Sequence, residues 1–162
     1  MDTPRLDLNA DILPSEGLGG LKLRIHFSEL EDIEGFPWFT QRDFYYLASP
    51  CEVRYRLGGG EIEAAVDVRN GKVFKLLACR GYSGKLFGKI YVGMPVKMAL
   101  EIEPRLFYDE AEEAIFCQDV PGLVIDIPEI DPPPKLVPDM FIDAISVFAP
   151  EAFTLSVQDG KW

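Results

Sequence analysis

The chain has 162 residues, of which 48% are apolar, and it carries a formal net charge of −11. An apolar fraction of this size can fill a core, which excludes an intrinsically disordered protein. The length suits one domain or two small units that share a core. A chain this acidic would be repelled by the phosphates of nucleic acids and by anionic membranes, so we expect neither as a partner. It would attract a basic protein.

The beginning of the chain, residues 1–16, has no basic stretch followed by an apolar run, and no run elsewhere approaches the length of a membrane span. We therefore expect a cytoplasmic protein. The three cysteines, Cys51, Cys79 and Cys117, lie far apart in apolar sequence. Their spacing predicts neither a disulfide framework nor a zinc site, so we expect buried thiols that act as small apolar side chains.

The first half of the chain has the pattern of a short strand and a short helix followed by a meander of strands. Residues 17–33 carry the strand and the helix, with Ser28 as the predicted N-cap. Apolar and charged residues then alternate on both sides of a three-glycine turn at residues 58–60, which is typical of a β-hairpin. The Asn70-Gly71 pair is a second hairpin signal and leads to a third strand over residues 73–79.

The second half follows the same plan. Residues 88–102 change from strand to helix spacing at Pro95, and a hairpin around residues 109–112 and two further strands follow. A shift of 69 residues superimposes the two strand-to-helix segments, which indicates an internal repeat. We predict an α+β fold, an antiparallel sheet with short helices on one side, built from an N-terminal segment (1–16), two repeated units (17–86 and 87–150) that share a core, and a C-terminal segment (151–162).

The alternating pattern also predicts which side chains are buried. They are Val53, Tyr55, Ile62, Ala64, Val66, Phe74, Leu76, Ile115, Leu123, Ile125 and Ile145. The proline-rich residues 128–139 predict a rigid, extended surface loop, with a ligand for a proline-binding domain as the alternative.

Catalytic signals are few. The single histidine, His26, stands between apolar residues, no serine lies in a nucleophile elbow, and the glycine-rich segments lack phosphate-loop spacing. The acidic residues near position 110 lack EF-hand spacing. We expect a structural His26, no metal or cofactor, and a protein that is not an enzyme. A pair of carboxylates that acts on glycosides depends on spatial separation, so a small enzyme stays open as an alternative.

Three segments carry a resemblance to a known family. They are the opening GLGGLKL, the run GKIYVGMPVKMALEIEP with RLFYDEAEEAIFC after it, and the late strand AISVF. Together they resemble cytoplasmic immunity proteins of bacterial toxin systems, and the helix-plus-three-strands duplication is similar to the tandem architecture of the β-lactamase inhibitor protein. The resemblance implies a protein that binds and blocks another protein. That inhibitor is secreted and disulfide-bonded, which this chain is not expected to be, so no binding residue is carried over by position.

Two regions could provide the contact surface of such an inhibitor, because anchors must desolvate well and charges must select the partner. The first is the aromatic stretch at residues 34–46, although at least half of its rings are expected to cap the sheet. The second is the acidic hairpin around residue 110 with the acids that follow it. The predicted partner-binding residues are Trp38, Phe39, Tyr45, Tyr46, Asp109, Glu110, Glu112, Glu113, Asp126, Glu129 and Asp131. We expect them to bind a cognate toxin or another basic protein; the alternatives are an enzyme and an adaptor or scaffold component.

Overall fold

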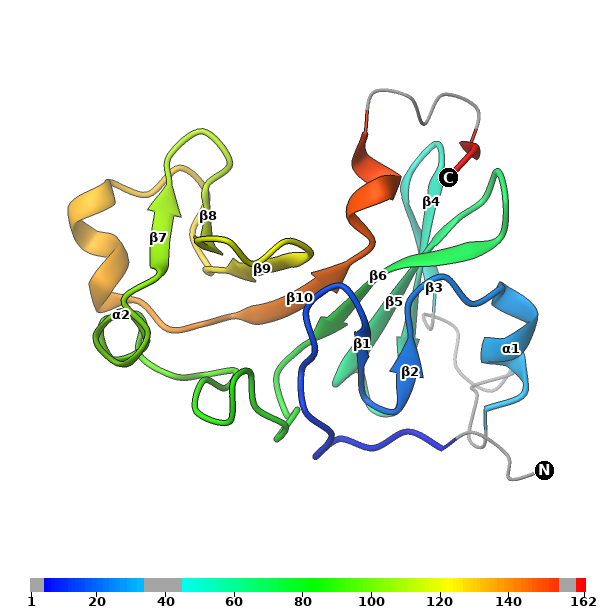
Figure 1. Cartoon of the computed structure of the whole chain (residues 1–162), viewed down its shortest axis with the longest axis horizontal. Coiled ribbons are helices and arrows are strands. Elements are labelled where there is room, and N and C mark those ends of the chain that lie inside the picture. Colours follow the sequence, from blue (N-terminus) through cyan, green and yellow to red (C-terminus); the bar gives the residue numbers. More distant parts are fainter. Residues whose placement is uncertain (1–4, 34–44, 155–159) are drawn as a thin grey trace.

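The structure is a computed structural model that describes residues 5–33, 45–154 and 160–162 (Figure 1). The fold is α+β, with an eight-stranded antiparallel sheet, a small antiparallel strand pair and short helices. The strands of the large sheet are β3 (Tyr45–Ser49), β4 (Glu52–Leu57), β5 (Ile62–Asp67), β6 (Lys72–Ala78), β7 (Leu106–Asp109), β8 (Ala114–Cys117), β9 (Leu123–Asp126) and β10 (Ala144–Phe148). The other elements are β1 (Gly17–Leu18), β2 (Leu21–Lys22), α1 (Phe27–Glu31), α2 (Val96–Ile102) and the 3-10 helices η1 (Pro134–Asp139) and η2 (Pro150–Phe153).

The large sheet consists of two four-stranded meanders that meet at its centre. The strand order is β3-β4-β5-β6-β10-β9-β8-β7, so each meander runs from an edge strand to a central strand. The central strands β6 and β10 pair antiparallel, with Ala78 opposite Ile145 and Leu76 opposite Val147. The sheet is therefore continuous across the two halves of the chain.

The backbone contacts that hold α1 recur around α2 at the offset of 69 residues. In both halves, an amide just before the helix and the amide of its first residue donate to carbonyls at the start of the central strand or in the residues just before it. These bonds join Arg24 to Val73 and Phe27 to Gly71 in the first half, and Gly93 to Ile142 and Val96 to Met140 in the second, with lengths of 2.7, 2.7, 2.8 and 2.9 Å. Each helix is thus fixed beside the central strand of its own half. The division into units 17–86 and 87–150 stays a prediction.

One apolar core lies on the helix side of the sheet. Figure 1 shows α1, α2 and the β1–β2 pair on this side. Side chains from both helices, such as Leu30 and Val96, join the same cluster as Leu76 and Ile145 of the central strands. No helix in the described ranges combines the length and the apolar character that a membrane crossing needs.

Eight of the side chains predicted to be buried are buried, and Val53, Tyr55 and Phe74 are only partly so. The prediction for Phe74 is wrong because of a β-bulge. Ala65 pairs with Lys75 whereas Val66 pairs with Val73, so Phe74 is an extra residue in β6 and the alternation changes phase there.

The other two residues that are only partly buried, Val53 and Tyr55, lie on β4, next to the edge strand of the sheet. Val53 pairs with Leu47, which is 66% exposed on the edge strand β3. Tyr55 is partly covered by Phe27 of α1, whose ring centroid lies 4.8 Å from its own. The core thus thins out toward this edge.

Two further expectations are corrected. Residues 134–139 form the 3-10 helix η1 rather than an extended loop, because the fixed φ of Pro134 suits the first position of a helix. Of the three thiols, Cys117 is buried, whereas Cys51 and Cys79 are only partly buried. Cys79 comes directly after the buried Ala78, so its side chain points to the opposite face of the sheet.

His26, and not Ser28, is the N-cap of α1. The His26 Nδ1 atom accepts the backbone N–H of Ser28 at 3.2 Å, and the Glu29 carboxylate accepts the backbone N–H of His26 at 3.3 Å. This reciprocal pair is a capping box, in which each side chain satisfies an amide that the helix leaves free. The histidine thus has a structural partner on the backbone.

Replacing His26 with alanine is expected to lower the free energy of unfolding by about 1 kcal/mol, because the cap is lost. Asparagine also caps helices well, so His26→Asn should restore most of this loss. Urea unfolding of the two variants and the wild-type protein measures both effects. Equal losses for alanine and asparagine would contradict the capping role.

Candidate functional site

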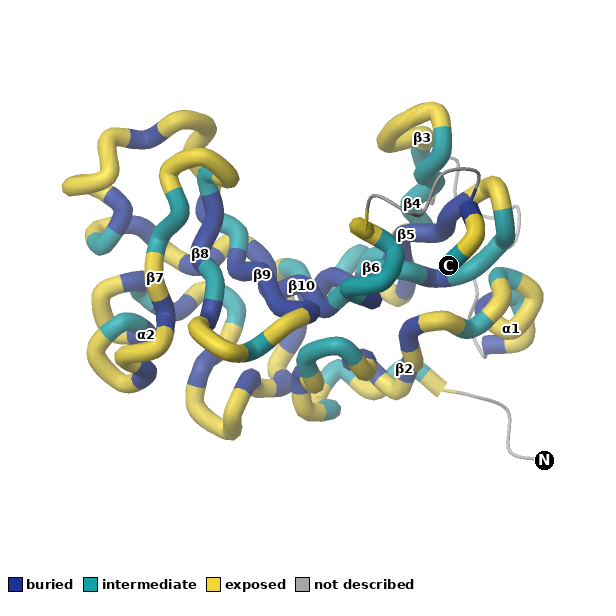
Figure 2. Tube along the Cα trace, turned by 45° about the horizontal axis from the view of Figure 1, so that its top comes forward, coloured by how far each residue is buried: buried dark blue, intermediate teal, exposed yellow. Residues whose placement is uncertain are grey.

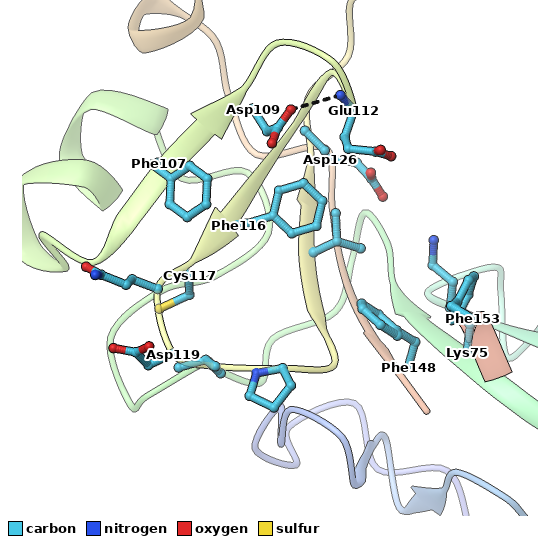
Figure 3. A pocket seen from close by; sticks show the side chains of 15 residues that line it. Lys75, Phe107, Asp109, Glu112, Phe116, Cys117, Asp119, Asp126, Phe148 and Phe153 are labelled. Carbon is cyan, nitrogen blue, oxygen red and sulfur yellow. Dashed lines mark hydrogen bonds between the residues drawn. The ribbon is translucent and has the colours of Figure 1, made fainter. Parts of the chain in front are cut away.

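The face of the sheet that points away from the core forms a groove of about 1030 Å³. Figure 2 shows β7 and β8 on one side of the buried path of β9 and β10, with β3 and β4 on the other side. The hairpin of β7 and β8 forms one wall, β6, β9 and β10 form the floor, and η2 closes the far end (Figure 3). The lining residues are Lys75, Phe107, Asp109, Glu112, Ala114, Phe116, Cys117, Gln118, Asp119, Val120, Pro121, Val124, Asp126, Phe148 and Phe153.

The strand period explains which side chains enter the groove. Successive side chains of a strand point to opposite faces, so every second residue of β8 and β9 is available to it. On β8, Ile115 is 1% exposed in the core while the flanking Phe116 lines the groove. On β9, Ile125 fills the core while Val124 and Asp126 line the groove. The pattern that builds the core therefore also builds the site.

Four phenyl rings give the groove its apolar surface. Phe107 and Phe116 pair across β7 and β8 with ring centroids 6.3 Å apart, and Phe148 and Phe153 form an edge-to-face pair at 5.1 Å. Figure 3 shows the two pairs on opposite sides of the groove. Phe107 is 47% exposed and Phe153 is 60% exposed, so these rings present apolar area to a ligand.

The charges of the groove are mostly negative. Asp109, Glu112, Asp119 and Asp126 contribute four carboxylates, against the single ammonium of Lys75. Asp109 also orders the hairpin turn, because its Oδ1 atom accepts the backbone N–H of Glu112 at 3.1 Å. The groove is thus an apolar surface bordered by acids, which suits an apolar ligand that carries positive charge.

Asp126 and Lys75 are the charged groups of the groove that burial affects most. They enter it from β9 and β6, the two strands that flank β10 (Figure 3). Burial raises the pKa of the Asp126 carboxyl, and burial lowers the pKa of the Lys75 ammonium. The contact of Asp126 with Ser146 Oγ is long, at 3.5 Å, and offers little compensation. Both charges are therefore held at a cost to the folded protein, which is typical of functional sites.

Replacing Asp126 with asparagine is expected to raise the free energy of unfolding at pH 7 by about 1 kcal/mol, because a partly buried charge is removed without a change of shape. Urea unfolding measures the effect. Asp119→Asn is the matched control, since Asp119 also lines the groove but is exposed, and its effect should stay within about 0.5 kcal/mol. A loss of stability in the Asp126 variant would show that its charge supports the fold.

The charges on the other half of this face satisfy one another. Arg54 Nε lies 2.6 Å from Glu52, and the Tyr46 hydroxyl donates to Glu63 at 3.0 Å. The Arg56 guanidinium lies over the Tyr46 ring, 4.8 Å from its centroid. Tyr46 is therefore engaged in an internal network. Among the described residues of this face, those that line the groove are therefore the better candidates for charges offered to a ligand.

The predicted contact residues are distributed as follows. Asp109, Glu112 and Asp126 line the groove together, whereas Glu110, Glu113, Glu129 and Asp131 do not line it. The Glu113 carboxylate instead accepts the backbone N–H of Asp131 at 2.7 Å. Tyr45 lies on edge strand β3, 55% exposed, with its ring 5.9 Å from that of Tyr55. Trp38 and Phe39 lie outside the described residues.

The sequence prediction missed Lys75 and the four phenylalanines. For Phe107 and Phe116 a signal was present, because each stands at an outward position between residues that the alternation assigns to the core. For Lys75 the sequence carried no such signal, because the β-bulge at Phe74 determines which face of the sheet Lys75 lies on.

No protein-family model matches this chain, and no curated protein matches its sequence. The fold is similar to that in the crystal structure of the uncharacterized protein yfeY from Escherichia coli, with a TM-score of 0.55 and 10% sequence identity. The similarity covers 84% of this chain and 98% of that one. At this level of identity the similarity concerns the fold alone.

Proposed function

We propose that this chain is a protein-binding inhibitor, a cytoplasmic immunity protein that captures a basic toxin in the groove and blocks it by steric and electrostatic occlusion. The observation that carries the proposal is the pairing of exposed phenyl rings with four carboxylates in one groove of about 1030 Å³. Aromatic anchors in desolvated pockets supply most of the affinity of protein interfaces. Charges at the border of such a pocket select the partner and speed its approach.

The carboxylates and the phenyl rings act at different stages of binding. The net charge of −11 draws a basic protein toward this face over the screening length of the solvent. The hairpin acids Asp109 and Glu112 then orient it, and an apolar side chain of the partner is buried between the two phenyl pairs. Because the groove lies between the β7–β8 hairpin and η2, a partner seated in it is covered from both sides.

The test uses the product of the gene next to the one that encodes this chain. The variant Asp109→Lys/Glu112→Lys reverses two charges that line the groove, and Glu129→Lys/Asp131→Lys makes the same change in net charge outside it. Stopped-flow kinetics at low salt should show association slowed about 10-fold or more by the groove reversal, with a flatter salt dependence, and less by the control. Equal rates for the two variants would mean that the partner docks elsewhere.

A further inference from the structure

Lys75 is the positive charge that lines the groove, and a surface that only bound cations would have no use for it. It lies on the central strand β6, opposite Ala65 on one side and Phe148 on the other, so neither neighbour in the sheet neutralises it. In the described part of the chain, no carboxylate lies within 4 Å of its ammonium, whereas Arg54 on the same face has Glu52 at 2.6 Å. Three acids, Asp126, Glu52 and Glu63, act on it only through space, and Asp126 acts most strongly.

A partly buried ammonium without an ion pair destabilises the protein that holds it. Perturbed charged groups of this kind cluster at functional sites, where a ligand can compensate the charge. The surroundings of Lys75 fit this, because Phe148, its neighbour on β10, and Phe153 form an apolar edge-to-face pair on its side of the groove. An anionic group that entered here would gain more from the ammonium than it would in water.

The charges of the groove are also separated along its length. Figure 3 shows Lys75 beside Phe148 and Phe153, and Asp109 and Glu112 on the hairpin side, with the Asp126 carboxylate between them. The fourth carboxylate, Asp119, lies apart from these, next to Cys117 and away from Lys75. A segment with only positive charge would meet the ammonium at one end. A segment with only negative charge would meet the carboxylates at the other. Neither satisfies both ends of the groove.

We infer that the groove takes a dipolar peptide segment, with an acidic side chain against Lys75, apolar side chains between the phenyl pairs and a basic side chain against Asp109 and Glu112. This inference rests on the proposed function, because it describes the part of the bound protein that enters the groove. Lys75 is then the residue that selects among basic partners, since only those that carry an acid at the right distance satisfy it.

Synthetic peptides test the inference without the toxin. Four capped peptides share the core Phe-Leu-Phe and differ at their ends, which are Arg and Glu, Arg and Gln, Gln and Glu, or Gln and Gln. The first three are made in both sequence orders. Titrations followed by the NMR signals of the groove residues Ala114 and Val124 give the affinities. The proteins are wild type, Lys75→Met and, as the control with the same loss of charge on an exposed side chain, Lys135→Met.

We expect the peptide with Arg and Glu to bind wild type at least 5-fold more tightly than the peptide with Arg and Gln. Lys75→Met should remove this difference, and Lys135→Met should preserve it. Lys75→Gln serves as a second variant if methionine alters the spectrum of the free protein. A preference for Glu that persists in the Lys75 variants, or its absence in wild type, overturns the inference.

The two proposals can fail separately. Peptides that bind in the groove without any dependence on Glu would overturn the role of Lys75 and leave the groove as a protein-binding site. Failure of every peptide to bind at millimolar concentration would also overturn the inference. An unchanged toxin association rate after the Asp109 and Glu112 reversal would instead overturn the proposed function, whatever the peptides do.

Discussion

Replacing Ile145 with alanine is expected to lower the free energy of unfolding by about 2–5 kcal/mol, the range for a large-to-small change in a packed core. The side chain is completely buried on β10. Its strand neighbours are Ala78 of β6 and Ile125 of β9, so it lies where the two meanders meet. The cavity would open in the part of the core that both halves of the chain share.

Ile130→Ala is the control, because Ile130 is 90% exposed and the chemical change is the same. Its effect should stay within about 0.5 kcal/mol. Urea unfolding should show a lower midpoint for the Ile145 variant with an unchanged slope and a single transition. Similar midpoints for the two variants, or two separate transitions, would show that the halves do not depend on a common core.

The local elements of this fold could be predicted from the sequence because their signals are local. The glycine turn at residues 58–60 and the Asn70-Gly71 pair specify their hairpins through the positive φ angles that they permit, 64° at Gly58 and 72° at Gly71. The pairing of β6 with β10 has no such signal. It joins residues about 70 positions apart, and only the apolar character of both strands indicates that they are central.

The candidate site was predictable to a smaller extent. Clustering in the sequence pointed to Asp109 and Glu112, since a hairpin keeps neighbours together in space. Proximity in sequence also suggested Glu110 and Glu113, which do not line the groove. The partners that make the groove chemically specific come from distant strands. Phe148 lies beside Lys75 only through the register of β10 on β6, which the sequence does not encode in any short pattern.

Acid is expected to destabilise the protein through two buried carboxylates. Burial opposes the ionisation of Asp67, yet hydrogen bonds from Arg69 and from the Trp162 indole outweigh it and lower the pKa of this carboxyl to about 2. Hydrogen bonds from Arg105, assisted by Lys89 and opposed by burial, lower the pKa of Glu103 to about 2. The side chains of both acids are less than 10% exposed, whereas those of Arg69 and Arg105 are 34% and 47% exposed, so solvent reaches the cationic side of each pair.

The sign of this pH effect follows from the linkage between proton binding and folding. A carboxylate whose pKa is lower in the folded state stabilises the protein above its unfolded pKa, about 4, and loses this contribution as the pH falls toward the folded value. We expect the free energy of unfolding to fall between pH 4.5 and pH 2, by about 2 kcal/mol for each of Asp67 and Glu103. Asp126 acts in the opposite direction, because its raised pKa means that protonation favours the folded state.

The double variant Asp67→Asn/Glu103→Gln separates these carboxylates from the other acids of the chain. It should be less stable than wild type at pH 7, because the charge-assisted hydrogen bonds of Arg69 and Arg105 are weakened. Its stability should change less between pH 4.5 and pH 2, since the two groups that lose their charge are absent.

Asp131→Asn/Glu129→Gln makes the same chemical change at exposed positions and should follow the wild-type curve. Urea unfolding at intervals of half a pH unit gives the three curves. Parallel curves for wild type and the Asp67 and Glu103 variant would show that other carboxylates control the acid sensitivity of the fold.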